Sequence, residues 1–144
     1  MRRIAVINQK GGVGKTTTAI NLAASLAATK RRVLLIDLDA QGNATMGVGV
    51  NKYELDKTAR DVLLEEAKIK DAIRVLPELG LSVLPANSDM TEAEIKLRDM
   101  PACDFALKSA LQEVQGDFDY ILLDCPPALS KLTVNAFVAA DHAR

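Results

Sequence analysis

The sequence is poor in the residues that mark disulfide-bonded or metal-binding proteins. Only two cysteines occur in 144 residues, Cys103 and Cys125, and they lie far apart with no C-x-x-C spacing. We therefore expect neither a zinc site nor a disulfide framework. Long hydrophobic runs are missing as well. No apolar stretch approaches the ~20 residues that a membrane-spanning helix requires, so no membrane partner is expected.

The chain also lacks an excess of charge of either sign. Eighteen basic and 19 acidic residues give a net charge of −1, which provides no global attraction for nucleic acid or an acidic membrane. Hydrophobic residues make up 49% and charged residues 26%, an ordinary balance for a soluble domain. The sequence enters an apolar run at Ile4, so no targeting peptide is expected. These features predict a cytoplasmic protein with a single domain over residues 1–144.

Short apolar runs alternate with helical patterns along the chain. Buried strands are expected at residues 4–7, 33–36, 81–84 and 120–123. Helices are expected where apolar residues recur every three or four positions, around residues 19–27 and at 58–66, 68–75, 91–99, 103–115 and 130–140. Residues 42–57 are expected to be irregular. This alternation predicts an α/β fold, a mostly parallel sheet flanked by helices.

The stretch KGGVGKTTT, residues 10–18, follows the first predicted strand and opens a helix. Its glycines let successive backbone N–H groups point at phosphate oxygens, and the dipole of the following helix favours the same anion. Lys15 is placed to reach the β- and γ-phosphates, and the Thr16 hydroxyl to bind Mg²⁺. We therefore predict a nucleotide site made by Lys10, Gly11, Gly12, Val13, Gly14, Lys15, Thr16 and Thr17.

Carboxylates follow two of the other predicted strands. Asp37 and Asp39 come after residues 33–36, and Asp124 comes directly after residues 120–123. Ligands of open α/β sheets bind beyond the carboxyl ends of the strands, so these side chains are expected beside the phosphate loop. For Asp37 two roles stay open, a catalytic one and a cap at the end of its strand.

The loop departs from the general pattern G-x-x-x-x-G-K-[ST], because Gln9 stands at its first glycine. With Lys10 and the paired glycines after it, the loop resembles the deviant Walker A motif of the ParA, MinD and nitrogenase iron protein group, P-loop NTPases of the SIMIBI type. The segments DLDAQGNAT and DCPPALSKLTVNAF also resemble the ParA/Soj partitioning ATPases of chromosomes and plasmids, more closely than MinD, which usually lacks QGNAT.

The resemblance implies roles for individual residues. Lys10 would contact the ATP held by the partner subunit of a homodimer, and with Lys15 and Asp39 it would promote hydrolysis. Asp39 would position the attacking water and the magnesium shell, while Thr16 and Asp124 would hold Mg²⁺. Hydrolysis and dimerisation would then be coupled, so that the protein works as a switch.

The resemblance also implies a ParB-type centromere-binding partner, non-specific DNA binding by the dimer, and nucleoid association. Family members continue beyond a sequence similar to the final AADHAR, so we expect a truncated chain, the N-terminal portion of a longer P-loop ATPase fold. Two alternatives remain. One is a nucleotide-binding fragment without turnover of its own, and the other is a MinD-like cell-division ATPase, which would need a C-terminal amphipathic helix.

Overall fold

The computed structural model describes residues 2–6, 13–127, 129–140 and 142–143, and for residues 13–16, 142 and 143 it describes the backbone alone. Six strands form one sheet in the order β3-β4-β2-β5-β1-β6. Their bounds are Arg2–Val6 (β1), Val33–Asp37 (β2), Arg74–Leu76 (β3), Leu81–Leu84 (β4), Tyr120–Asp124 (β5) and His142–Ala143 (β6). Every neighbouring pair is parallel except β3 and β4. The predicted α/β fold with a mostly parallel sheet is confirmed.

The central strands are buried and mostly apolar because the sheet is covered on both faces. All five residues of β2 and all four of β4 are buried. Successive side chains of a strand point to opposite faces. Accordingly, Leu34 and Ile36 join one hydrophobic cluster. Val33 and Leu35 join a second cluster on the other face, as a sheet between two helical layers requires.

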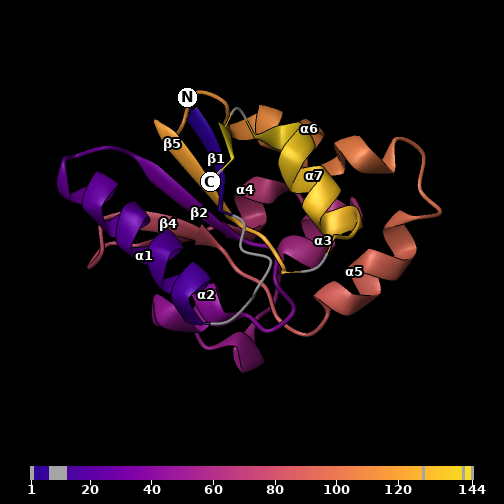
Figure 1. Cartoon of the computed structure of the whole chain (residues 1–144), viewed down its shortest axis with the longest axis horizontal. Helices are drawn as coiled ribbons and strands as arrows, with labels where there is room; N and C mark the ends of the chain where they lie inside the picture. The colour runs from indigo at the N-terminus through magenta and orange to yellow at the C-terminus, as the bar shows by residue number, and fades with distance from the viewer. Residues whose placement is uncertain (1, 7–12, 128, 141, 144) are drawn as a thin grey trace.

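The helices divide into two layers (Figure 1). One face of the sheet is covered by α1 (Val13–Ala28) and α2 (Asn43–Gly47). The other face is covered by α3 (Ala59–Leu63), α4 (Ile69–Ala72), α5 (Met90–Leu97), α6 (Ala106–Leu111) and α7 (Lys131–Ala139). Single 3₁₀ turns are η1 (Lys52–Glu54), η2 (Cys103–Phe105) and η3 (Gln112–Val114). Within the described ranges, no helix has the length and apolar character needed to cross a membrane.

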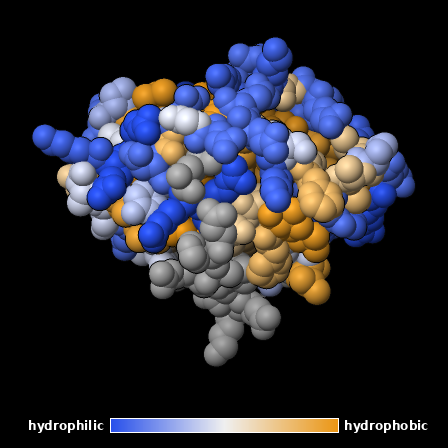
Figure 2. All heavy atoms as spheres, turned by 90° about the horizontal axis from the view of Figure 1, so that it is seen from above, coloured by the Kyte–Doolittle hydropathy of each residue, from blue (hydrophilic) through white to orange (hydrophobic). Residues whose placement is uncertain are grey.

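Most of the surface seen from above is hydrophilic, with one hydrophobic area at its edge (Figure 2). Most of the large apolar side chains fill the two clusters, where residues such as Leu35, Leu63 and Ile121 have no exposed surface. Burial of such side chains is the main force that holds the layers together, at roughly 25 cal/mol for each Å² of apolar surface removed from water.

The structure corrects several predicted elements. The helix expected at residues 68–75 ends at Ala72, and β3 follows as an antiparallel edge strand. Strand β3 has only three residues, two of them exposed, so its own sequence carries little strand signal. It is a strand because it pairs with β4. Residues 42–57, expected to be irregular, contain α2 and η1. The helix at 58–66 stops at Leu63, since Glu65 adopts a left-handed conformation with φ 61°.

Three other predicted elements differ in extent. The helix expected at 103–115 is divided into η2, α6 and η3. The first strand spans Arg2–Val6, and Ile7, which was included in it, lies outside the described residues. Strand β6 was not predicted, because two residues carry no periodicity of their own and depend on their pairing with β1.

Buried polar contacts fix α7 against the rest of its layer. The Asn135 side chain is fully buried, and its Oδ1 accepts from the backbone N–H of Leu107 at 3.0 Å. Its Nδ2 donates to the carbonyls of Cys103 and Lys131, both at 2.9 Å. At the start of α7, the Glu94 carboxylate accepts from the backbone N–H groups of Lys131 and Leu132 at 2.9 and 3.1 Å. The helix is therefore anchored to η2, α6 and α5.

We expect Asn135→Ala to lower the free energy of unfolding by about 1–3 kcal/mol, because it leaves buried backbone groups without partners. Urea denaturation checks this. Asn21→Ala, at an exposed position of α1, is the matched control and is expected to stay within about 0.5 kcal/mol of wild type. Equal unfolding free energies for the two variants would contradict the anchoring role.

Candidate functional site

Three strand ends meet at one edge of the sheet. Strand β5 lies between β1 and β2, and its last residue, Asp124, is in register with Val6 of β1 and with Asp37 of β2. Neighbouring strands are about 4.8 Å apart, so the end of β1 and both carboxylate positions lie within roughly 10 Å. The structure therefore brings Asp37 and Asp124 to the edge from which the predicted phosphate loop leaves β1.

The predicted loop itself is only partly described. Lys10, Gly11 and Gly12 lie outside the described residues, and α1 begins at Val13. Of Val13, Gly14, Lys15 and Thr16 the backbone alone is described, as the first turn of a helix of 16 residues. Thr17 follows in that helix and is exposed. The phosphate-binding roles of these residues stay predictions.

Asp37 is buried and accepts three hydrogen bonds. Its Oδ1 accepts from the backbone N–H of Asp39 at 3.0 Å. Its Oδ2 accepts from both the backbone N–H and the hydroxyl of Thr45, at 2.9 and 2.7 Å. The Thr45 hydroxyl accepts in turn from the backbone N–H of Ala86, just after β4, at 2.9 Å. Of the two roles left open by the sequence, this arrangement fits the cap.

Asp39 lies in a tight turn that follows β2. It is nearly buried, with 9% of its surface exposed. Its Oδ1 accepts from the backbone N–H of Gln41 at 3.0 Å, and its carbonyl accepts from the N–H of Gly42 at 2.9 Å. Gly42 has φ 64°, and a Cβ added there would lie 2.8 Å from the carbonyl oxygen of Ala86. The turn thus needs glycine at this position.

The position of Asp37 at this edge shifts its pKa. Burial raises the pKa of Asp37 to about 7, and the neighbouring Asp124 acts in the same direction. The hydrogen bonds from Thr45 and Asp39 oppose the shift, because they stabilise the charged form. Two buried carboxylates on adjacent strands repel each other, so a cation bound between the strand ends and a phosphate would lower the energy of the site.

The residues present fit a magnesium ion held together with a nucleotide. In the part of the chain that the structure describes, no group of three or more His, Cys, Asp or Glu side chains could hold a metal ion. Mg²⁺ does not require such a group, since it is commonly bound by one or two carboxylates, water and the phosphates of its substrate. Asp124 at the end of β5 and Asp39 in the turn after β2 offer carboxylates of this kind.

Three residues of this edge were not singled out from the sequence. Thr45 lies within the quoted QGNAT segment but received no role, and Ala86 contributes only its backbone. The Lys52 ammonium donates to the carbonyl of Gln41. Lys52, Ala40 and Gln41 also line a cavity of about 360 Å³ beside the Asp39 turn. Only the fold brings these segments together, so no local pattern could have found them.

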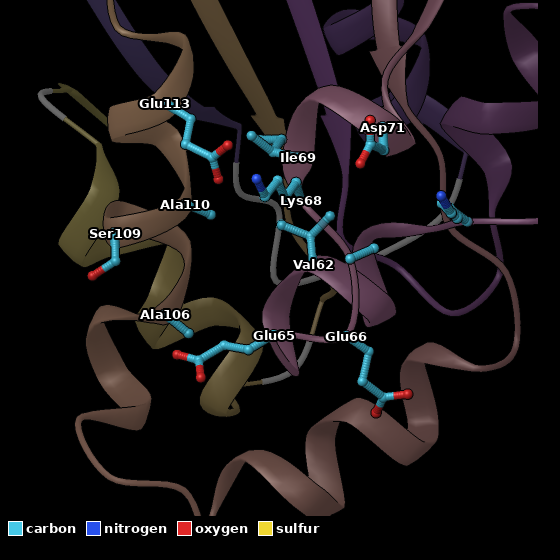
Figure 3. Close-up of a pocket in the computed structure, with 12 residues that line it drawn as sticks. Val62, Glu65, Glu66, Lys68, Ile69, Asp71, Ala106, Ser109, Ala110 and Glu113 are labelled. Atoms are coloured by element: carbon cyan, nitrogen blue, oxygen red, sulfur yellow. The ribbon is translucent and has the colours of Figure 1, made fainter.

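Another cavity, of about 510 Å³, lies away from this edge, between α3, α4 and α6 (Figure 3). Val62, Ile69 and Ala110 supply apolar lining, and Glu65 and Glu113 supply negative charge. The edge that carries Asp39 and Asp124 is the better candidate for a nucleotide, because it lies at the carboxyl ends of parallel strands, where ligands of open α/β sheets bind.

Comparison with known proteins identifies the family. The family model described as AAA domain matches residues 1–143. The chain belongs to this family. This chain is 46% identical over 138 residues to the sporulation initiation inhibitor protein Soj of Bacillus subtilis, and the match covers 96% of this chain and 54% of Soj. It is 48% identical over 143 residues to the chromosome partitioning protein ParA of Caulobacter vibrioides, covering 98% of this chain and 54% of ParA.

A crystal structure supports the same assignment. This chain matches cobyrinic acid a,c-diamide synthase of Mycobacterium smegmatis, solved with a bound ATP analog and magnesium, with a TM-score of 0.96 and 42% identity. The match covers 99% of this chain and 58% of the synthase chain. The ParA/Soj resemblance drawn from the sequence motifs is confirmed, as is the P-loop ATPase fold. The chain spans about half the length of the curated relatives it matches.

We expect Asp37→Asn to lower the free energy of unfolding of the nucleotide-free chain by about 1–3 kcal/mol. The reason is that an Asn side chain cannot accept all three hydrogen bonds that Asp37 accepts from Asp39 and Thr45. The pKa of Asp37 near 7 in the folded state exceeds the value of ~3.9 in an unfolded chain. The wild-type protein therefore loses stability as pH rises between these values, and the variant lacks this contribution. The difference between the two proteins should narrow from pH 5 to pH 8 in urea titrations. A difference that widens, or one that equals that of the exposed control Asp56→Asn, would contradict this assignment.

We expect Gly42→Ala to lower the unfolding free energy by more than about 1 kcal/mol, since alanine is strained at positive φ and its Cβ would meet the Ala86 carbonyl. Gly49→Ala is the matched control, because Gly49 has φ 90° with no atom within 4 Å of an added Cβ. The excess loss of the Gly42 variant measures how strongly the Ala86 carbonyl resists a side chain at this turn. An equal loss in both variants would contradict this role of the Ala86 carbonyl.

Proposed function

We propose that this chain binds ATP with Mg²⁺ and forms part of a dimerising switch ATPase for chromosome or plasmid segregation. The observation that carries the proposal is the register of β1, β5 and β2, which aligns Val6, Asp124 and Asp37 at one edge. The match to the AAA domain family over residues 1–143 supports it. Residues 1–144 are proposed to form a single P-loop ATPase domain, the N-terminal portion of a longer fold, since the relatives are about twice as long.

The proposed residue roles follow from charge and position. Lys15 and the backbone amides of the loop stabilise the negative charge that develops on the phosphate oxygens. Thr16, Asp39 and Asp124 hold Mg²⁺, which neutralises phosphate charge when bound. Asp39 also orients the water that attacks the γ-phosphate. These residues position the reactants and stabilise charge, so the protein forms no covalent bond to the substrate in this scheme.

Dimerisation is proposed to complete the site. Lys10 of one subunit reaches the nucleotide of the other and supplies the charge that an arginine finger supplies in other NTPases, worth about 10³ to 10⁵ in rate. A nucleotide that contacts both subunits stabilises the dimer, and its hydrolysis releases them.

The partners are proposed from the named relatives. Soj is described as a sporulation initiation inhibitor and ParA as a chromosome partitioning protein. We propose that the full-length protein is cytoplasmic, binds DNA non-specifically on the nucleoid, and responds to a ParB-type centromere-binding protein. The relative whose crystal structure holds an ATP analog and magnesium is a different protein, cobyrinic acid a,c-diamide synthase. The proposed binding of ATP and Mg²⁺ is supported by this structure, whose chain is 42% identical to this one.

We expect Lys15→Ala to abolish binding of a fluorescent ATP analogue, measured by titration with and without Mg²⁺, because the variant loses the charge that faces the β- and γ-phosphates. Lys30→Ala, at an exposed position in the turn after α1, controls for the loss of a lysine and should bind as wild type does. Lys10→Ala should keep binding but lose ATP-dependent dimerisation and hydrolysis, measured by light scattering and phosphate release.

The results separate the alternatives. A wild-type chain with no saturable binding would exclude the ATPase switch for this chain. Saturable binding without hydrolysis would favour the nucleotide-binding fragment. Full hydrolysis by Lys10→Ala would exclude the shared site while leaving ATP binding intact.

A further inference from the structure

The segment that carries Asp39 is held at both of its ends by one side chain. The carboxylate of Asp37 accepts from the N–H of Asp39 at 3.0 Å and from the N–H of Thr45 at 2.9 Å. Residues 38–45, a turn followed by the first residues of α2, therefore form a segment whose two ends converge on Asp37. Asp37 lies within β2, in register with Asp124. These hydrogen bonds therefore attach the segment directly to the sheet.

The hydroxyl of Thr45 fixes the same segment to a second strand. It donates to Asp37 at 2.7 Å and accepts from the backbone N–H of Ala86 at 2.9 Å. A hydroxyl has one proton to donate. Since the N–H of Ala86 is itself a donor, the Thr45 hydroxyl accepts from Ala86 and donates its proton to Asp37. The direction of both hydrogen bonds is therefore fixed. Thr45 and Asp37 are both fully buried, so water does not compete for these bonds.

The middle of this segment is also held against Ala86. Gly42 packs so closely on the carbonyl of Ala86 that a Cβ would lie 2.8 Å from that oxygen. Lys52 covers the outer side, where its Cδ would lie 2.9 Å from the same Cβ, and its ammonium donates to the carbonyl of Gln41. The turn that presents Asp39 is thus confined between Ala86 and Lys52.

We infer that Asp37 and Thr45 form a clasp that sets the orientation of the Asp39 carboxylate, and that both are positioning residues for ATP hydrolysis. The inference rests on the proposed function of Asp39. Neither residue touches the nucleotide in this scheme. The clasp acts through the N–H of Asp39 and through the turn between residues 39 and 42, so that Asp39 meets the attacking water in one orientation.

Thr45→Val and Thr45→Ser test the clasp. Valine has the shape of threonine but neither donates to Asp37 nor accepts from Ala86, whereas serine keeps both bonds. We expect Thr45→Val to lower kcat for Mg²⁺-dependent ATP hydrolysis by about 10- to 100-fold, the effect of a small misplacement of a catalytic group. Affinity for the fluorescent ATP analogue should be unchanged, because the phosphate loop is intact. Thr45→Ser should restore kcat.

Thr58→Val is the matched control. Thr58 is also a buried threonine whose side chain accepts a backbone hydrogen bond, from the N–H of Arg60 at 3.2 Å at the start of α3. Its loss destabilises the fold without touching the clasp, so kcat should not fall. If Thr58→Val lowers kcat as much as Thr45→Val does, the effect is loss of stability and the inference is overturned.

A readout without turnover distinguishes this inference from the proposed function. Amide hydrogen exchange of nucleotide-free protein should accelerate at Asp39 in Thr45→Val and stay slow in Thr45→Ser, while the amide of Leu122 in β5 is unchanged in both. If the wild-type protein fails to hydrolyse ATP, the proposed ATPase function is contradicted. In that case the exchange rate of the Asp39 amide still tests whether Asp37 and Thr45 hold the Asp39 turn. Unchanged exchange at Asp39 in Thr45→Val, or a raised KM at constant kcat, overturns the inference.

Discussion

The Asp37 carboxylate, buried at the end of β2, accepts hydrogen bonds from Asp39 and Thr45 that organise the ligand-facing edge of the sheet. Backbone groups in a buried loop must find partners, or each costs about 1–3 kcal/mol. A carboxylate is the side chain suited to this task, since it offers two oxygens and no donor when ionised. Through Thr45 the same carboxylate reaches Ala86, and so joins the loop after β2 to the end of β4. The position of Asp39 depends on these contacts.

A buried carboxylate beside a second one is costly in the free protein. Burial and the proximity of Asp124 raise the pKa of Asp37 to about 7. The Asp37 carboxyl group therefore changes its charge near neutral pH. Shifted pKa values accompany both structural networks and functional sites. Here the two coincide, because the residue that stabilises the loop lies one strand away from a proposed magnesium ligand. A cation bound at these strand ends would be attracted by both carboxylates.

The segment after β5 is held in a comparable way by residues distant in sequence. Glu94 of α5 caps the first N–H groups of α7, and Asn135 joins α7 to η2 and α6. Both segments that leave the ligand-facing edge, after β2 and after β5, thus end in polar contacts with rigid elements. In such a site the reacting groups are placed by the packed scaffold and not by the loops alone. The cavity between α3, α4 and α6 takes no part in this arrangement (Figure 3).

The sequence by itself determined what depends on neighbouring residues. Hydrophobic periodicity predicted the α/β order and the central parallel strands, and the spacing around Lys10 and Lys15, with the QGNAT segment, predicted the family. Contacts between distant residues were decided by the tertiary structure. Asp37 could be a cap or a catalytic group until the fold brought Thr45 to it, and Thr45 had no role until Ala86, 41 residues away, donated to its hydroxyl. Likewise β3 became a strand because β4 pairs with it. Local patterns contain propensity and spacing, whereas hydrogen-bond partners and strand pairing belong to the packed chain as a whole.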